Sequence, residues 1–175
     1  SNGINDRMEH RKVDLFVHWG WNGNWSSGGN PTYNYLQNKG NRKANAKTII
    51  IDPWYNDTAM VVADEWIPIR GTTDTAMVLG MLYILITEDD PETNPLIDWD
   101  FLRRCTVGFD ETMMPEGVDP QGNLKNYVLG VSDGIPKTPV WASEICGVPP
   151  ERIRQLAIEI ATTKNVAILS ANAPA

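Results

Sequence analysis

The apolar stretch Val13-Asp-Leu-Phe-Val-His-Trp19 has the composition of a buried strand, and it runs directly into Gly20-Trp-Asn-Gly-Asn24. Residues 20–29 are mostly turn-forming, which gives the backbone freedom for close approach to another group. A glycine-rich loop after a first buried strand is the usual place for a diphosphate, although a plain connecting loop is the alternative. The residues expected to present amides to phosphate oxygens are Gly20, Asn22, Gly23 and Asn24.

Strand and helix patterns alternate outward from this stretch. Further strands are expected at 47–51, at 65–69 as an edge strand because of Pro68, and at 166–169. Helices are expected at 31–45, 56–62, 74–87, 101–105, 139–145 and 150–163. This alternation predicts one α/β domain over residues 1–175, a parallel-sheet, Rossmann-like, three-layer α/β/α fold. A loosely structured helical excursion is expected within it, at about 88–138.

Two carboxylates follow predicted strands, where ligands of parallel sheets bind. Asp52 ends the second strand and can accept hydrogen bonds from ribose hydroxyls, or it can simply stabilise the turn. Asp74 begins a helix. Its simpler role is a favourable interaction with the helix dipole, and its functional role would be to accept two N–H hydrogen bonds from the edge of a guanine base. The loops at 20–29, 52–58 and 70–74 should therefore come together.

Composition excludes several classes of function. A net charge of -7 without a basic patch argues against nucleic acid as a partner. Neither G-x-G-x-x-G nor a P-loop is present, and the two cysteines, Cys105 and Cys146, form no C-x-x-C, so zinc and iron–sulfur sites are not expected in this chain. The apolar run 76–86 is too short to span a bilayer, and we find no targeting signal. No catalytic constellation and no metal site is predicted.

Several sequence strings occur together in an order and spacing that resemble the dimethyl sulfoxide reductase family of molybdenum enzymes. The similarity is greatest to the branch of anaerobic dimethyl sulfoxide reductase catalytic subunits, and it covers nearly the whole chain. The strings include Ile50-Ile-Asp-Pro-Trp-Tyr-Asn-Asp-Thr-Ala59, Ala63-Asp-Glu-Trp-Ile-Pro-Ile-Arg70, Thr73-Asp74 and Asp133-Gly-Ile-Pro-Lys-Thr-Pro139.

This resemblance implies a bis(molybdopterin guanine dinucleotide) molybdenum cofactor in a larger parent subunit, with this chain as the domain that holds one guanine dinucleotide arm. It assigns a ribose-side carboxylate to Asp52 and a guanine-side carboxylate to Asp74. The other residues that it places at the cofactor are Trp19, Gly20, Asn22, Gly23, Asn24, Trp54, Thr58 and Thr73.

The sequence departs from the family pattern at three positions. Gly23 replaces a proline after the asparagine of the first loop, and Trp54 stands where arginine is usual. The third loop reads Arg70-Gly-Thr-Thr-Asp74 in place of R-P-G-T-D, so Thr72 replaces a glycine. These departures concern the phosphate and ribose contacts more than the fold.

The resemblance further implies that the parent reduces an S- or N-oxide in anaerobic respiration. Its partners would be the other domains of the same subunit, an iron–sulfur subunit and a membrane anchor, and its location the periplasmic or extracytoplasmic face of a bacterial membrane. The parent's iron–sulfur cluster and molybdenum ligand are expected outside this chain, which should be inactive alone. The alternatives are a non-catalytic Rossmann-like nucleotide-binding module and a relative that has lost cofactor binding.

Overall fold

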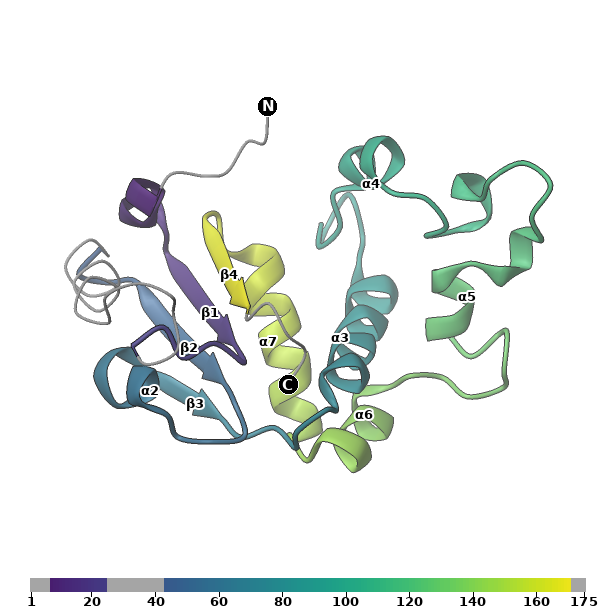
Figure 1. Cartoon of the computed structure of the whole chain (residues 1–175). Helices are drawn as coiled ribbons and strands as arrows, with labels where there is room; N and C mark the ends of the chain where they lie inside the picture. The colour runs from purple at the N-terminus through teal and green to yellow at the C-terminus, as the bar shows by residue number, and fades with distance from the viewer. Residues whose placement is uncertain (1–6, 25–42, 171–175) are drawn as a thin grey trace. The chain divides into compact units, whose positions relative to one another are not determined.

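The computed structural model describes residues 7–24 and 43–170. Its strands within this part of the chain form one parallel sheet in the order β3-β2-β1-β4 (Figure 1). The strand bounds are β1 Leu15–Trp19, β2 Lys47–Ile51, β3 Glu65–Ile67 and β4 Val166–Ser170. Trp19 pairs in register with Ile51, so the loops that follow β1 and β2 leave the same edge of the sheet.

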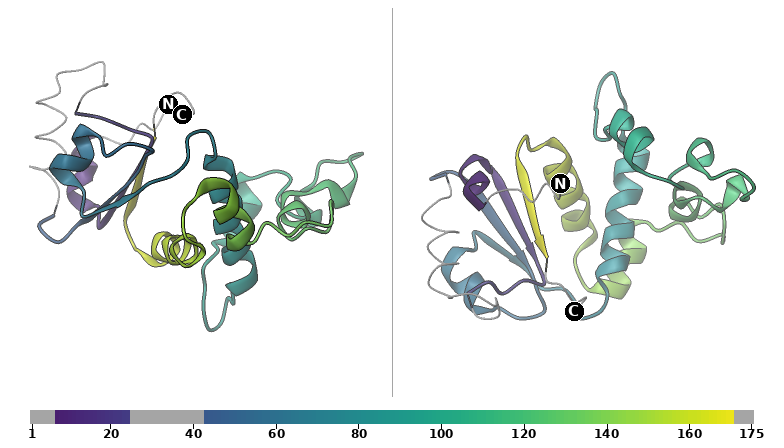
Figure 2. Two further views of the ribbon diagram at one scale, coloured as in Figure 1. Left: turned by 90° about the horizontal axis from the view of Figure 1, so that it is seen from below. Right: turned by 45° about the horizontal axis from the view of Figure 1, so that its top comes forward.

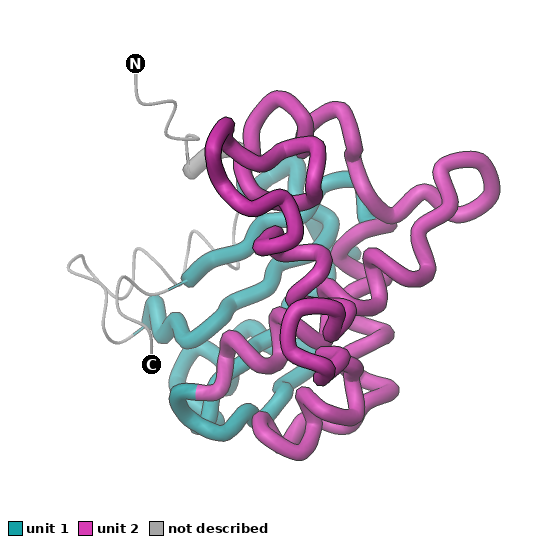
Figure 3. Tube along the Cα trace, turned by 90° about the vertical axis from the view of Figure 1, so that its right-hand side faces the viewer, with its two compact units in different colours: residues 1–72, 163–175 teal, residues 73–162 magenta. Residues whose placement is uncertain are grey.

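The chain divides into two compact units, one of residues 1–72 and 163–175 and the other of residues 73–162 (Figure 3). The first unit contains the sheet, the 3-10 helix η1 Arg7–Lys12 and the short helix α2 Asp57–Val62. Ile50 of β2 packs against Ala59 and Val62, which fixes α2 on one face of the sheet. The side chain of Asn56 accepts a hydrogen bond from the amide of Ala59 and so caps α2.

The second unit is helical, and its longer helices are α3 Asp74–Glu88, α6 Pro139–Cys146 and α7 Pro150–Thr162. Gly80 lets α3 approach α6 closely, because a Cβ there would lie only 2.7 Å from the Cβ of Ala142. Arg154 of α7 pairs with Glu88 at the end of α3 through two hydrogen bonds of 2.7 and 2.6 Å. These contacts join the three helices into one packed group.

The residues between α3 and α6 carry α4 Trp99–Cys105, two 3-10 turns and α5 Leu124–Val128 (Figure 2). The turns are η2 Glu111–Met113 and η3 Pro120–Gly122. Asp89 holds the first loop through the amides of Leu96 and Ile97 and the indole of Trp99. Lys137, with only 2% of its side chain exposed, donates to Asp133 and to the Ile135 carbonyl.

The structure confirms the predicted α/β class and parallel sheet, and β3 lies at an edge as expected from Pro68. The predicted strands and helices agree with the described ones to within two residues, apart from the helix predicted at 31–45, which lies largely outside the described residues. The sequence did not predict α5 or the 3-10 turns, because each is a single turn stabilised by a local Asp or Asn cap.

Candidate functional site

Asp52 lies at the carboxyl end of β2 and is 8% exposed. Its Oδ1 accepts a 2.8 Å hydrogen bond from the Trp54 amide, and its Oδ2 accepts one of 2.9 Å from the side chain of Asn56. The carboxylate thus forms the turn after the strand, as one of its two expected roles requires. An ionised carboxylate has about four acceptor positions, so two remain for hydroxyl donors.

Two aromatic residues stiffen the backbone around Asp52. The indole nitrogen of Trp66 in β3 donates a 2.9 Å hydrogen bond to the Asp52 carbonyl. Tyr55 packs on Trp66 with ring centroids 5.4 Å apart in an edge-to-face arrangement. The carboxylate is therefore held from both its side chain and its backbone, which is the preorganisation that a binding residue needs.

A hydrogen-bonded latch joins the loop after β1 to the start of α2. The buried Thr58 hydroxyl donates to Asn22 Oδ1 at 2.7 Å and accepts from the Asn24 amide at 3.1 Å. The Asn24 side chain reaches the Asp57 carbonyl at 3.5 Å, and the Asn22 amide group reaches the Asp57 carboxylate at 3.4 Å. The structure thus brings the first of the three expected loops against the second, and Gly71 of the third loop lies beside Pro53 of the second.

The expectation that four amides of the first loop face phosphate oxygens is wrong for two of them. The Gly20 amide donates to the Ile51 carbonyl at 2.9 Å and so extends the sheet ladder. The Asn24 amide is taken by the Thr58 hydroxyl. Any role of Gly20 and Asn24 at a ligand must therefore use their other atoms or the shape of the loop.

Gly23, which replaces a proline of the family pattern, lies under the ring of Trp21. A Cβ at position 23 would overlap the present position of that ring, so any other residue there would require the Trp21 side chain to move. Trp21 in turn contacts the buried ring of His18, with centroids 4.9 Å apart. The ring of Trp21 thus occupies the space beside Gly23 and packs on the buried His18.

The third loop carries strain at the position where the family pattern has glycine. Thr72 has φ 67°, in the left-handed region that a β-branched residue rarely adopts. Thr73 follows as the N-cap residue of α3, although its side chain makes no capping hydrogen bond to the helix. Asp74 is the half-buried first residue of α3 and belongs, like Thr73, to the second compact unit.

Sequence reasoning did not assign three residues that organise this site, namely Tyr55, Asn56 and Trp66. Asparagine is a common N-cap residue, so the sequence is compatible with Asn56 as the cap of α2. Its second contact, to the Asp52 carboxylate, depends on the geometry of the turn and cannot be read from the sequence pattern. In the part of the chain that the structure describes, no group of three or more His, Cys, Asp or Glu could hold a metal ion. Among the helices of that part, none is long and apolar enough to cross a membrane.

This parallel sheet, with a buried carboxylate and hydrogen-bonded loops at its carboxyl edge, defines an α/β domain whose candidate ligand site lies at the carboxyl ends of the strands. A family model described as molybdopterin oxidoreductase matches residues 4–107, more than half of the chain. The chain therefore belongs to the molybdopterin oxidoreductase family, and membership implies a molybdenum–molybdopterin cofactor.

Individual relatives agree with this family. The chain is 48% identical over 139 residues to the dimethyl sulfoxide reductase DmsA of Escherichia coli strain K12. The matched residues make up 79% of this chain and 16% of the relative. It is 38% identical to a dimethyl sulfoxide/trimethylamine N-oxide reductase of Cereibacter sphaeroides over 70% of this chain and 13% of the relative. The structure is similar to acetylene hydratase from Pelobacter acetylenicus, with a TM-score of 0.64, 27% identity, and coverage of 90% of this chain and 18% of the other. The chain thus spans about a sixth of these relatives.

Proposed function

We propose that this chain is the domain of a molybdenum-dependent, dimethyl sulfoxide reductase-like enzyme that binds the guanine dinucleotide part of the molybdopterin cofactor. The observation that carries the proposal is the Asp52 carboxylate, which is fixed at the carboxyl edge of the sheet with acceptor positions to spare. Ribose hydroxyls are the donors that such a carboxylate accepts in dinucleotide-binding folds.

The hydrogen-bonding groups of the first unit fit a sugar better than a metal ion. Asp52 accepts hydroxyl hydrogens, and the latch of Asn22 with Thr58 gives the adjacent loop a fixed shape. When bound, the cofactor supplies the redox chemistry, while the residues of this chain bind and orient its nucleotide end. Trp19 at the end of β1 completes this set, and Thr73 and Asp74 of the second unit have proposed roles on the guanine side.

In the intact protein, this domain would serve a reductase for an S- or N-oxide in anaerobic respiration. The proposed partners are the remaining domains of the subunit, an iron–sulfur subunit and a membrane anchor, with the complex at the periplasmic or extracytoplasmic face. The similarity to DmsA and to a dimethyl sulfoxide/trimethylamine N-oxide reductase supports this assignment. The 175-residue chain alone should bind no molybdenum and reduce no oxide.

A relative that has lost cofactor binding is the second candidate, favoured by the Gly20 and Asn24 amides already engaged within the protein. Titration of the chain with guanosine diphosphate decides between the two. Wild type should bind, and Asp52→Asn should bind about tenfold more weakly, the usual effect of losing hydrogen bonds to a charged group. Asp64→Asn is the matched control, because Asp64 holds the amide of Thr48 at the opposite end of β2. Absence of binding to wild type would favour the degenerate relative.

A further inference from the structure

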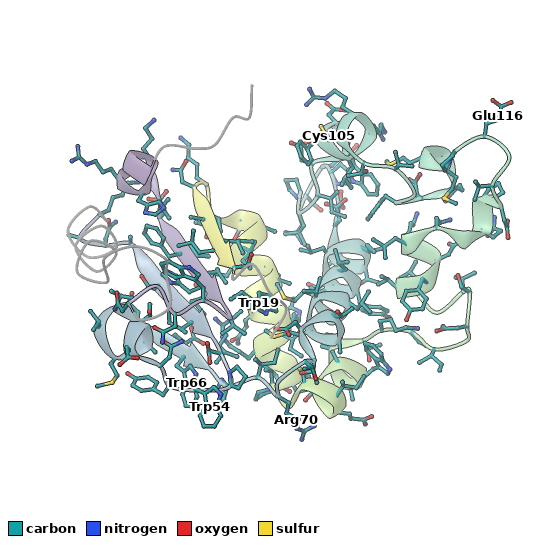
Figure 4. The ribbon with its side chains drawn as sticks, in the orientation of Figure 1. Trp19, Trp54, Trp66, Arg70, Cys105 and Glu116 are labelled. Atoms are coloured by element: carbon teal, nitrogen blue, oxygen red, sulfur yellow. The ribbon has the colours of Figure 1, made fainter. Side chains whose placement is uncertain are left out.

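Among the described residues of the first unit, Trp54 is the most exposed large apolar side chain, at 78%. Its backbone amide is fixed to Asp52 at 2.8 Å, yet its indole extends away from the end of β2 (Figure 4). The indole therefore presents an accessible aromatic face, which is the kind of surface on which a base can stack. The neighbouring rings of Tyr55 and Trp66 are by contrast packed on each other.

We propose that the Trp54 indole is a stacking platform for the purine base of a bound nucleotide, an inference that rests on the proposed nucleotide-binding function. Asp52 and Trp54 are two residues apart in one turn, so a nucleotide whose ribose contacts the carboxylate is long enough to reach the indole. The part that reaches it is either the base or the diphosphate.

The chemistry of indole selects the base. The indole carries no positive charge and offers an electron-rich face, which suits the flat π-surface of a purine and not a dianionic diphosphate. Arginine, the residue usual at this position in the family pattern, can serve both groups because it stacks and also pairs with phosphate. Substitution by tryptophan keeps the flat surface and removes the charge.

The turn around Asp52 fixes the backbone that carries the Trp54 indole. Asp52 holds the amide of Trp54 and the side chain of Asn56, while its carbonyl accepts from Trp66. The backbone of Trp54 is therefore constrained before any ligand arrives, which lowers the entropy lost on binding. Stacking uses the face of a base, so it is blind to the donors and acceptors on the ring edge.

The experiment compares wild type, Trp54→Ala and Trp54→Phe in titrations of the 175-residue chain with guanosine diphosphate, adenosine diphosphate and inorganic pyrophosphate. Trp54→Ala should weaken both nucleoside diphosphates by about five- to tenfold, the lower end of base–aromatic stacking, and leave pyrophosphate unchanged. Trp54→Phe should stay within about threefold of wild type, because a smaller ring still stacks. Met60→Ala is the matched control, since Met60 is an apolar side chain that is 70% exposed on α2 and offers no aromatic face for stacking.

The outcomes separate this inference from the function on which it rests. Guanosine diphosphate binding that Asp52→Asn weakens but Trp54→Ala leaves unchanged would overturn the stacking role alone. An equal loss of pyrophosphate and nucleotide binding in Trp54→Ala would also overturn it, because a base platform has no effect on a ligand without a base. No binding of any probe by the folded wild type would overturn both proposals.

Discussion

The Thr58 hydroxyl donates a 2.7 Å hydrogen bond to Asn22 Oδ1, across 36 residues of sequence. The same hydroxyl accepts from the amide of Asn24, so one buried oxygen joins the first loop to the start of α2. Thr58 has no exposed surface, so water cannot reach its hydroxyl unless the loop opens. The hydrogen bonds to Asn22 and Asn24 are therefore the ones that satisfy this buried hydroxyl.

Thr58→Val should therefore loosen the site while keeping the side-chain shape. The change leaves Asn22 Oδ1 and the Asn24 amide without the hydroxyl, so we expect a loss of about 1–3 kcal/mol in unfolding free energy. Guanosine diphosphate should also bind more weakly, since the loop no longer has one shape. Urea unfolding and titration measure the two effects. Thr112→Val, which removes an exposed hydroxyl bonded to Asp110, should change neither, and an equal loss in both variants would contradict the latch.

Thr72→Gly should stabilise the protein. A residue with φ 67° and a Cβ costs roughly 1–2 kcal/mol, while the extra chain entropy of glycine costs about 0.5–1 kcal/mol, so the net gain is about 0.5–1 kcal/mol. Thr72 is exposed, and its side chain contributes little packing. The urea midpoint tests this change. Thr75→Gly, at the second residue of α3, should instead destabilise by up to about 1 kcal/mol, because a helical residue gains no relief of strain from glycine, and a loss at both positions would show that Thr72 is unstrained.

The main sheet was predictable because its strands are local. Lys47–Ile51 has the same bounds in the structure as in the sequence pattern, because a short run rich in β-branched residues and followed by proline favours a strand. The carboxylate Asp52 was predictable for a related reason, because its place at the strand end follows from the strand itself. The same reasoning could not find Trp66 as a partner of the Asp52 carbonyl, because that contact joins two strands.

The wrong expectation about the Gly20 and Asn24 amides has a physical cause. Turn-forming composition predicts backbone freedom but not which acceptor each amide meets. Ile51 and Thr58, which provide those acceptors, are distant in sequence and are brought near only by strand pairing and by α2. The strain at Thr72 was equally hidden, because composition does not reveal a positive φ at a non-glycine residue.

The ion pair of Lys137 with Asp133 predicts acid sensitivity in the second unit. The hydrogen bond from Lys137, at 2.6 Å, is the main cause that lowers the pKa of Asp133 below its ordinary value. The unfolded chain then binds more protons than the folded one, so stability is present above the unfolded pKa of about 3.9 and is lost as pH falls through the folded pKa.

Lys137→Met should reduce this acid sensitivity. The drop in melting temperature from about pH 5 to pH 2.5 should be smaller in the variant than in wild type, because Asp133 then titrates near its unfolded pKa. Asp133→Asn should reduce the drop in the same way, since it removes the titrating group. Thermal melts across this range are the measurement. A drop equal to that of wild type in both variants would assign the acid response to other carboxylates.

Asp74→Ala should remove a preference for guanine over adenine. An ionised carboxylate only accepts hydrogen bonds, and guanine offers two adjacent donors where adenine presents an acceptor, so the pair discriminates by about 1–3 kcal/mol. Titrations of guanosine and adenosine diphosphates on wild type and variant measure the preference, which Trp54→Ala should leave intact. Glu151→Ala is the control, because Glu151 is likewise an acidic residue in the first turn of a helix, α7. If wild type binds guanosine diphosphate and Asp74→Ala leaves both affinities unchanged, Asp74 serves only the start of α3.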